Sequence, residues 1–74
     1  MTDSQINDLI FEVTEEGDGG FVAECLTESI VTQADSWEEL RENAKDAVRG
    51  YFFDSALPRH IHLRFRRDEV IKLS

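Results

Sequence analysis

Residues 9–25, which read LIFEVTEEGDGGFVAEC, decide the fold of this chain. Apolar and polar residues alternate on both sides of a turn that holds three glycines in four positions, a pattern typical of a β-hairpin with half-buried strands. Glycine supplies the positive φ angle that such a turn requires. We therefore expect a first strand over residues 6–14 and a return strand over residues 21–26. One face of this hairpin is expected to carry Leu9, Phe11, Val13, Phe21, Ala23 and Cys25.

A third strand and a helix are predicted after the hairpin. Residues 30–34 are rich in β-branched side chains, which favour a short strand. Ser36 is a natural helix N-cap, and Glu39, three positions later, completes a capping box. The helix is expected to end near Asp54, because Pro58 disfavours helical geometry at the residue before it. Residues spaced by three and four form its apolar stripe: Trp37, Leu40, Ala44, Ala47, Val48 and Tyr51.

Residues 60–65 alternate again and predict a fourth strand, with Ile61, Leu63 and Phe65 facing inward. The resulting order is β-β-β-α-β, within one domain that covers residues 1–74, since the chain is too short for two. This order predicts an α+β fold with two layers, in which one helix packs on one face of an antiparallel sheet.

The opposite face of the sheet is expected to be only partly polar. A domain of this size buries a modest core, and a single cysteine excludes an internal disulfide, so oligomerisation is the remaining means of stabilisation. Apolar residues on the second face predict a homodimer or a higher homo-oligomer. These residues are Ile10, Val22, Leu26 and Val31.

Charge is distributed unevenly along the sequence. The first 40 residues carry eleven carboxylates and no Lys or Arg, whereas the last 34 carry all eight Lys and Arg and five carboxylates. The corresponding net charges are −11 and +3, within a total of −8. An acidic surface binds nucleic acid poorly, is repelled by anionic lipid and suits a basic partner.

Several residues could carry chemistry, and each has a simpler explanation. Glu12, Glu24 and Asp35 could neighbour each other across the strands and serve a hydrolase, but carboxylates on the solvent face of a sheet are ordinary. His60 and His62 share one strand face at a spacing that can chelate a metal, yet exposed strand histidines beside arginines are the simpler interpretation. We therefore expect no catalytic residue, no metal and no cofactor.

Two further features receive structural interpretations. Cys25 lies in phase with the apolar face of its strand, so a buried, inert thiol is expected. The one basic cluster is more consistent with neutralising the acidic strands than with binding RNA, because no exposed aromatic residues are interleaved with it. RNA binding through this cluster remains a weaker hypothesis. The cluster consists of Arg59, Arg64, Arg66 and Arg67.

Several segments, in this order and spacing, resemble the HicB-like antitoxin family over nearly the whole chain. This resemblance implies a β-β-β-α-β core similar to a reduced ribonuclease H fold. It also implies a protein that neutralises a small basic toxin of the HicA type, which cleaves messenger RNA. The segments are 11–16 (FEVTEE), 20–25 (GFVAEC), 31–36 (VTQADS), 37–40 (WEEL), 43–48 (NAKDAV) and 61–70 (IHLRFRRDEV).

The sequence and the resemblance together predict a protein-binding module rather than an enzyme. No DNA-binding module follows the domain, so operator binding is not expected. A metal-dependent hydrolase or nuclease remnant of the ribonuclease H fold is the alternative. The N-terminal residues lack the pattern of a signal peptide, and a lone thiol suits a reducing compartment, so a cytoplasmic location is expected. The residues expected to bind the partner are Glu12, Glu15, Glu16, Glu24, Glu28, Glu38 and Glu42.

Overall fold

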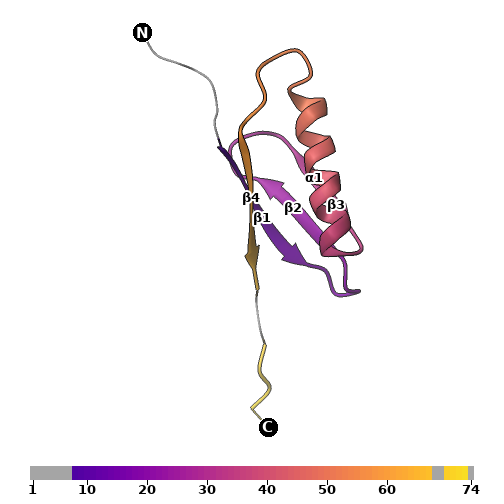
Figure 1. Cartoon of the computed structure of the whole chain (residues 1–74). Helices are drawn as coiled ribbons and strands as arrows, with labels where there is room; N and C mark the ends of the chain where they lie inside the picture. Colours follow the sequence, from indigo (N-terminus) through magenta and orange to yellow (C-terminus); the bar gives the residue numbers. More distant parts are fainter. Residues whose placement is uncertain (1–7, 68–69, 74) are drawn as a thin grey trace.

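The computed structural model describes residues 8–67 and 70–73. It has the predicted order of four strands and one helix, and the α+β class is confirmed (Figure 1). The first predicted strand also included residues 6 and 7, which lie outside the described residues. The elements are β1 (Asp8–Glu15), β2 (Phe21–Cys25), β3 (Val31–Ala34), α1 (Trp37–Tyr51) and β4 (His60–Arg66).

The sheet is mixed, so the expectation of a fully antiparallel sheet is wrong for one strand pair. The strand order is β3-β2-β1-β4, in which β1–β2 and β2–β3 are antiparallel and β1–β4 is parallel. The reason is the number of chain reversals. Two hairpin turns make β3 parallel to β1, and a single helix then carries the chain back before β4 begins. The connection from β3 through α1 to β4 is therefore a crossover between parallel strands.

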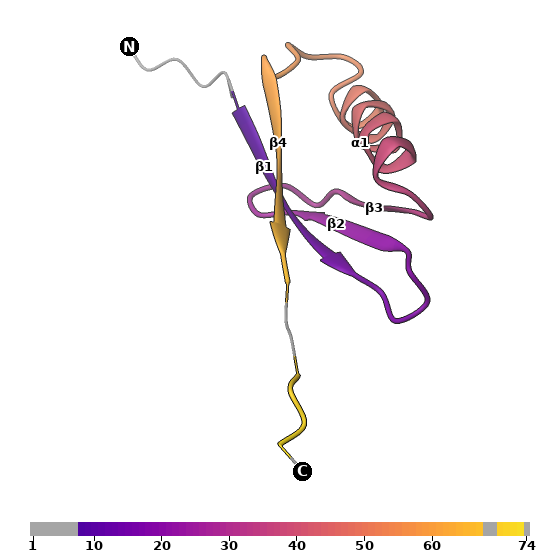
Figure 2. The same ribbon diagram turned by 60° about the horizontal axis from the view of Figure 1, so that its bottom comes forward.

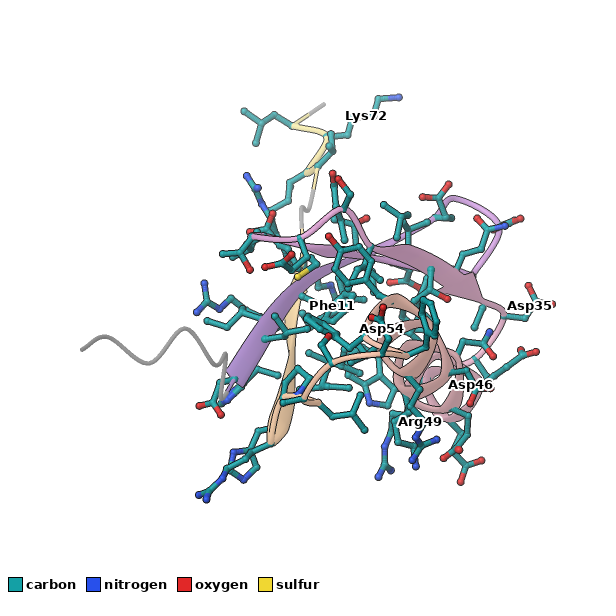
Figure 3. All side chains as sticks on the ribbon, turned by 90° about the horizontal axis from the view of Figure 1, so that it is seen from above. Phe11, Asp35, Asp46, Arg49, Asp54 and Lys72 are labelled. Carbon is teal, nitrogen blue, oxygen red and sulfur yellow. The ribbon has the colours of Figure 1, made fainter. Side chains whose placement is uncertain are left out.

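The hydrophobic core lies between the sheet and α1, on the face predicted from the alternation of β1 and β2. Leu9, Phe11 and Val13 are fully buried, and Ala23 and Cys25 are buried beside them. Figure 3 shows Phe11 between the sheet and the helix. Because side chains in a strand alternate between faces, this core leaves every second residue of the strands on the uncovered side.

The helix begins as its capping box predicts. The Glu39 backbone N–H donates to Ser36 Oγ at 3.1 Å, and Glu39 Oε1 accepts from the Asp35 backbone N–H at 3.2 Å. At the other end the helix stops at Tyr51, earlier than the predicted Asp54, because the Phe52 N–H makes the last bond to the Val48 carbonyl before the chain turns. The buried residues of the predicted stripe are Leu40, Ala44 and Val48.

The helix packs mainly against β3 and β2, as Figure 2 shows in side view. The inner face of β4 is therefore covered less completely, and Ile61 and Leu63 there are only half buried. Among the described residues, no helix is long and apolar enough to cross a membrane.

Candidate protein-binding surface

The sheet face opposite α1 carries the acidic pair that the sequence singled out. Glu12 on β1 and Glu24 on β2 are direct cross-strand neighbours in the antiparallel register. Like charges directly opposite each other destabilise a sheet unless something neutralises them. Arg66 on β4 lies 3.6 Å from Glu12 and supplies part of that neutralisation. Glu24 forms no ion pair with any other described residue.

Apolar residues surround this pair on the same face. Val31 on β3 is the cross-strand neighbour of Glu24. Ile10 and Leu26 are adjacent on β1 and just after β2, where the Leu26 backbone N–H donates to the Ile10 carbonyl. Leu26 and Val31 are exposed, whereas Ile10 and Val22 are half buried. The predicted second face therefore exists, but its apolar residues are interleaved with carboxylates.

A second acidic feature is a hollow of about 330 Å³ at the hairpin end of the molecule. The register pairs Phe21 with Ala34, which brings the β1–β2 turn beside the corner between β3 and α1. The Asp18 carboxylate accepts from the Gly20 N–H at 3.1 Å, so it also stabilises the turn. Glycine at position 20 avoids a close contact, since a Cβ there would lie 3.2 Å from the Ala34 carbonyl oxygen. The carboxylates that line the hollow are Glu16, Asp18, Asp35 and Glu39.

The seven carboxylates predicted from the sequence are placed in four parts of the molecule. Glu12 and Glu24 share the uncovered sheet face, and Glu15 and Glu16 lie at the hairpin end. Glu28 faces the helix, where its Oε1 accepts from the Tyr51 hydroxyl at 3.1 Å, and this hydrogen bond raises the pKa of Tyr51. The remaining two, Glu38 and Glu42, are exposed on α1, and Glu42 pairs with Lys45 at 2.9 Å.

The structure adds residues to the acidic hollow that the sequence did not select. Of the four carboxylates that line it, only Glu16 is among the predicted partner-binding residues. Glu39 belongs to the predicted capping box, Asp35 to the hydrolase alternative, and Asp18 lies among the glycines of the predicted turn. The strand register Phe21–Ala34 brings them together, and a correct alignment of the predicted second and third strands would have revealed it. Asp35 lies beside Gly20 near the hairpin turn, whereas the Glu12–Glu24 pair lies further along the strands, so the hydrolase trio does not form one cluster.

The two histidines lie beside a carboxylate, Asp8, that is not among the predicted site residues. His60 Nδ1 lies 2.9 Å from Asp8 Oδ1, and His62 Nε2 lies 3.4 Å from Asp8 Oδ2. The hydrogen bond from His60 is the main reason that the pKa of Asp8 falls below its usual value of 3.8. Within residues 8–67 and 70–73, no group of three or more His, Cys, Asp and Glu side chains is arranged to hold a metal ion.

This arrangement predicts a specific titration behaviour. Replacing His60 by Gln is expected to raise the pKa of Asp8 towards 3.8, because the largest contribution to the lowered pKa is lost. Replacing His62 by Gln is expected to raise it less, since that hydrogen bond contributes less. Carboxyl carbon NMR titrations of both variants and the wild type measure these shifts, and equal shifts in the two variants would contradict the assignment.

The sign of the accompanying pH effect follows from the lowered pKa. The stability that Asp8 contributes is fully present above its usual pKa of 3.8 and is lost as the pH falls through the lower value of the folded state.

Cys25 and Arg66 of the basic cluster have the structural roles that the sequence predicts. Cys25 is a buried free thiol, as expected. The basic cluster is not one patch: Arg64 and Arg66 both lie on the outer sheet face, whereas Arg59 precedes β4 and lines a groove with residues of α1. The Arg66–Glu12 pair agrees with the interpretation that this cluster offsets the acidic strands.

Comparisons with known proteins identify the family. A UPF0150 protein of Thermotoga maritima is 42% identical to this chain over 64 residues, which cover 86% of the chain and 90% of the relative. A UPF0150 protein of Archaeoglobus fulgidus is 47% identical over 55 residues, which cover 74% of the chain and 82% of the relative. No family model and no solved structure matches the chain. At this identity and coverage, the chain belongs to the UPF0150 protein family.

Proposed function

We propose that this protein is a binding module for a small basic protein and acts in the manner of a HicB-like antitoxin on an RNA-cleaving toxin. The observation that carries this proposal is the Glu12–Glu24 pair on the sheet face that α1 leaves uncovered. The resemblance of the sequence supplies the kind of partner. A cytoplasmic location, where messenger RNA is present, goes with this function.

The repulsion between Glu12 and Glu24 is only partly compensated among the described residues. The Glu12 and Glu24 carboxylates face each other across adjacent strands. The Arg66 guanidinium lies 3.6 Å from the Glu12 carboxylate and forms an ion pair with Glu12 only. A Lys or Arg of a partner placed between the two carboxylates would replace repulsion with attraction. A toxin that binds RNA carries such cations on its RNA-binding surface. The same contact would both hold the toxin and block its access to RNA.

Apolar residues on this face favour a protein partner over a small cation. Leu26 and Val31 are exposed next to the carboxylates, and apolar contacts of this kind supply affinity while the charges supply orientation and encounter rate. The acidic hollow at the hairpin end extends the negative potential along the molecule.

The decisive experiment is titration of a purified HicA-type ribonuclease with this chain, together with an assay of RNA cleavage by the toxin. We expect a complex that weakens as salt is added and RNA that is protected in proportion to complex formation. The double variant Glu12→Gln, Glu24→Gln is expected to bind about tenfold more weakly or worse. Failure to form any complex at low salt would contradict the proposal.

A matched control uses two glutamates on a different surface. Glu38→Gln, Glu42→Gln removes the same charge from α1. It is expected to lower the affinity by less than about threefold, because screening by salt weakens distant charges. A larger effect of this variant would assign binding to the helix instead of the sheet. RNA cleavage by this chain alone would support the hydrolase alternative.

In the unbound protein, the repulsion between Glu12 and Glu24 is expected to lower the free energy of unfolding. Replacing Glu24 by Thr removes the cross-strand repulsion and introduces a residue that favours strands, so we expect a gain of roughly 0.2–1 kcal/mol in the free energy of unfolding. Urea unfolding followed by circular dichroism measures this difference. A loss of stability would show that the two carboxylates are not in net repulsion.

A further inference from the structure

A groove with an apolar floor and a basic rim lies between α1 and β4, on the face of the sheet opposite the acidic pair. Its volume is about 390 Å³. None of the described residues that line it is acidic, which is unusual in a chain with a net charge of −8. The rim carries Arg41, Lys45, Arg49 and Arg59. The floor is formed by Ala44, Val48, Leu57, Pro58, Ile61 and Leu63.

One side of this groove is formed by one of the two edges of the sheet. The strand order β3-β2-β1-β4 places β4 at an edge, with β1 on its other side. An edge strand presents unpaired backbone N–H and C=O groups that can pair with an added strand. The groove lies beside the first half of β4, so the side chains of an added strand would enter it.

The chain itself contains a segment with the required pattern. Val70, Ile71 and Leu73 are 95%, 70% and 96% exposed. In an extended strand Ile71 and Leu73 point to one face, and Val70 and Lys72 point to the other. Figure 1 shows this segment beyond the C-terminal end of β4, whereas the groove lies beside the residues that begin β4. In one copy, therefore, the segment extends away from its own groove.

We propose that the segment Val70–Leu73 of a second copy pairs with the free edge of β4 and places Ile71 and Leu73 in the groove. Charge complementarity favours this occupant. The sequence has two carboxylates, Asp68 and Glu69, immediately before the segment, and the rim of the groove is basic. Reciprocal exchange of the same segment gives a closed twofold dimer.

This dimer differs from the one expected from the sequence. A homodimer through the outer sheet face would bring the Glu12–Glu24 pairs of two copies together and add to their repulsion. Exchange through the groove buries apolar side chains on the other face and leaves the acidic pair accessible. The proposed exchange of the C-terminal segment does not depend on the proposed function.

The first test is the oligomeric state of the full chain by sedimentation at micromolar to millimolar concentration. We expect a dimer whose dissociation constant rises about tenfold or more in the double variant Ile71→Ser, Leu73→Ser. The matched control, Val70→Ser with Lys72→Ser, alters the opposite face of the same segment and is expected to dimerise like the wild type. A monomeric wild type, or a dimer that the Ile71 and Leu73 changes leave intact, would overturn the proposal.

A second test uses complementation between two defective chains. Leu57→Ser damages the groove and keeps the segment, whereas the Ile71→Ser, Leu73→Ser chain keeps the groove. A mixture can form a heterodimer in which one exchange is intact and both defects fall in the other. A second defect in an exchange that is already broken costs little, so the mixture is expected to dimerise more strongly than either variant alone. A mixture that dimerises no better than its components would overturn the exchange. Circular dichroism of each variant verifies that the altered residues, which are exposed, leave the fold intact.

Discussion

Replacing Phe11 by Ala is expected to remove a large fraction of the free energy of unfolding of this protein. The Phe11 side chain is fully buried on β1, beneath α1 and between the two neighbouring strands. Removing a buried phenyl ring costs about 3–5 kcal/mol, through lost burial and through the cavity that remains. A domain of this length has a total stability of roughly 4–11 kcal/mol. Urea unfolding followed by far-ultraviolet circular dichroism measures the loss.

The same substitution at an exposed position is the control. Phe53 lies after the helix and is 82% exposed, so Phe53→Ala is expected to change the free energy of unfolding by less than about 0.5 kcal/mol. A loss below about 1 kcal/mol in Phe11→Ala would mean that the core is centred elsewhere.

Replacing Trp37 by Ala is expected to lower the free energy of unfolding by about 1–3 kcal/mol, mainly through the loss of two ring contacts, because Trp37 itself is 37% exposed. Trp37 at the start of α1, Phe21 on β2 and Phe65 on β4 form a triangle of edge-to-face rings. Their centroids are 5.6, 6.1 and 5.9 Å apart. Each such pair adds about 0.5–1.5 kcal/mol beyond the burial of its surface. The triangle connects the helix start to both strands, so its loss affects three elements together.

Trp37→Phe separates ring geometry from simple burial. A smaller ring retains edge contacts with Phe21 and Phe65, so this variant is expected to lose less than half as much stability as Trp37→Ala. Thermal unfolding followed by circular dichroism suits all three proteins, because the fluorescence of the only tryptophan is lost in both variants. Equal losses in Trp37→Phe and Trp37→Ala would contradict a role for the ring contacts. Because Phe21 also lines the acidic hollow, the triangle supports the shape of that surface.

The order of elements and the inner face of the sheet were predictable because both depend on local periodicity. Leu9, Phe11 and Val13 occupy every second position, and side chains at every second position of a strand point to the same face and can be buried together. Ser36 and Glu39 fix the helix start through hydrogen bonds between residues three and four apart. The parallel direction of β4 could also have been predicted, because the number of chain reversals determines it.

The candidate surfaces were predictable only in part. The opposition of Glu12 and Glu24 follows from a hairpin centred on the glycine-rich turn, which the sequence already predicted. The grouping of Glu16 and Asp18 with Glu39 depends on the register between β2 and β3, so it follows from an alignment of the two strands and not from spacing along the chain alone. Asp8 was missed as the partner of His60 because nothing local relates two residues that are 52 positions apart.

By itself, the sequence determined which residues form strands and helix and which side of each element is apolar, since backbone periodicity is a property of neighbouring residues. Only the tertiary structure decided that Glu28 faces Tyr51 instead of sharing a surface with Glu12. It also decided that Arg59 lines the same groove as Arg41, whereas Arg66 pairs with Glu12 on the opposite face of the sheet. Charges act through space, and strand register and the helix crossover determine which distant charges become neighbours.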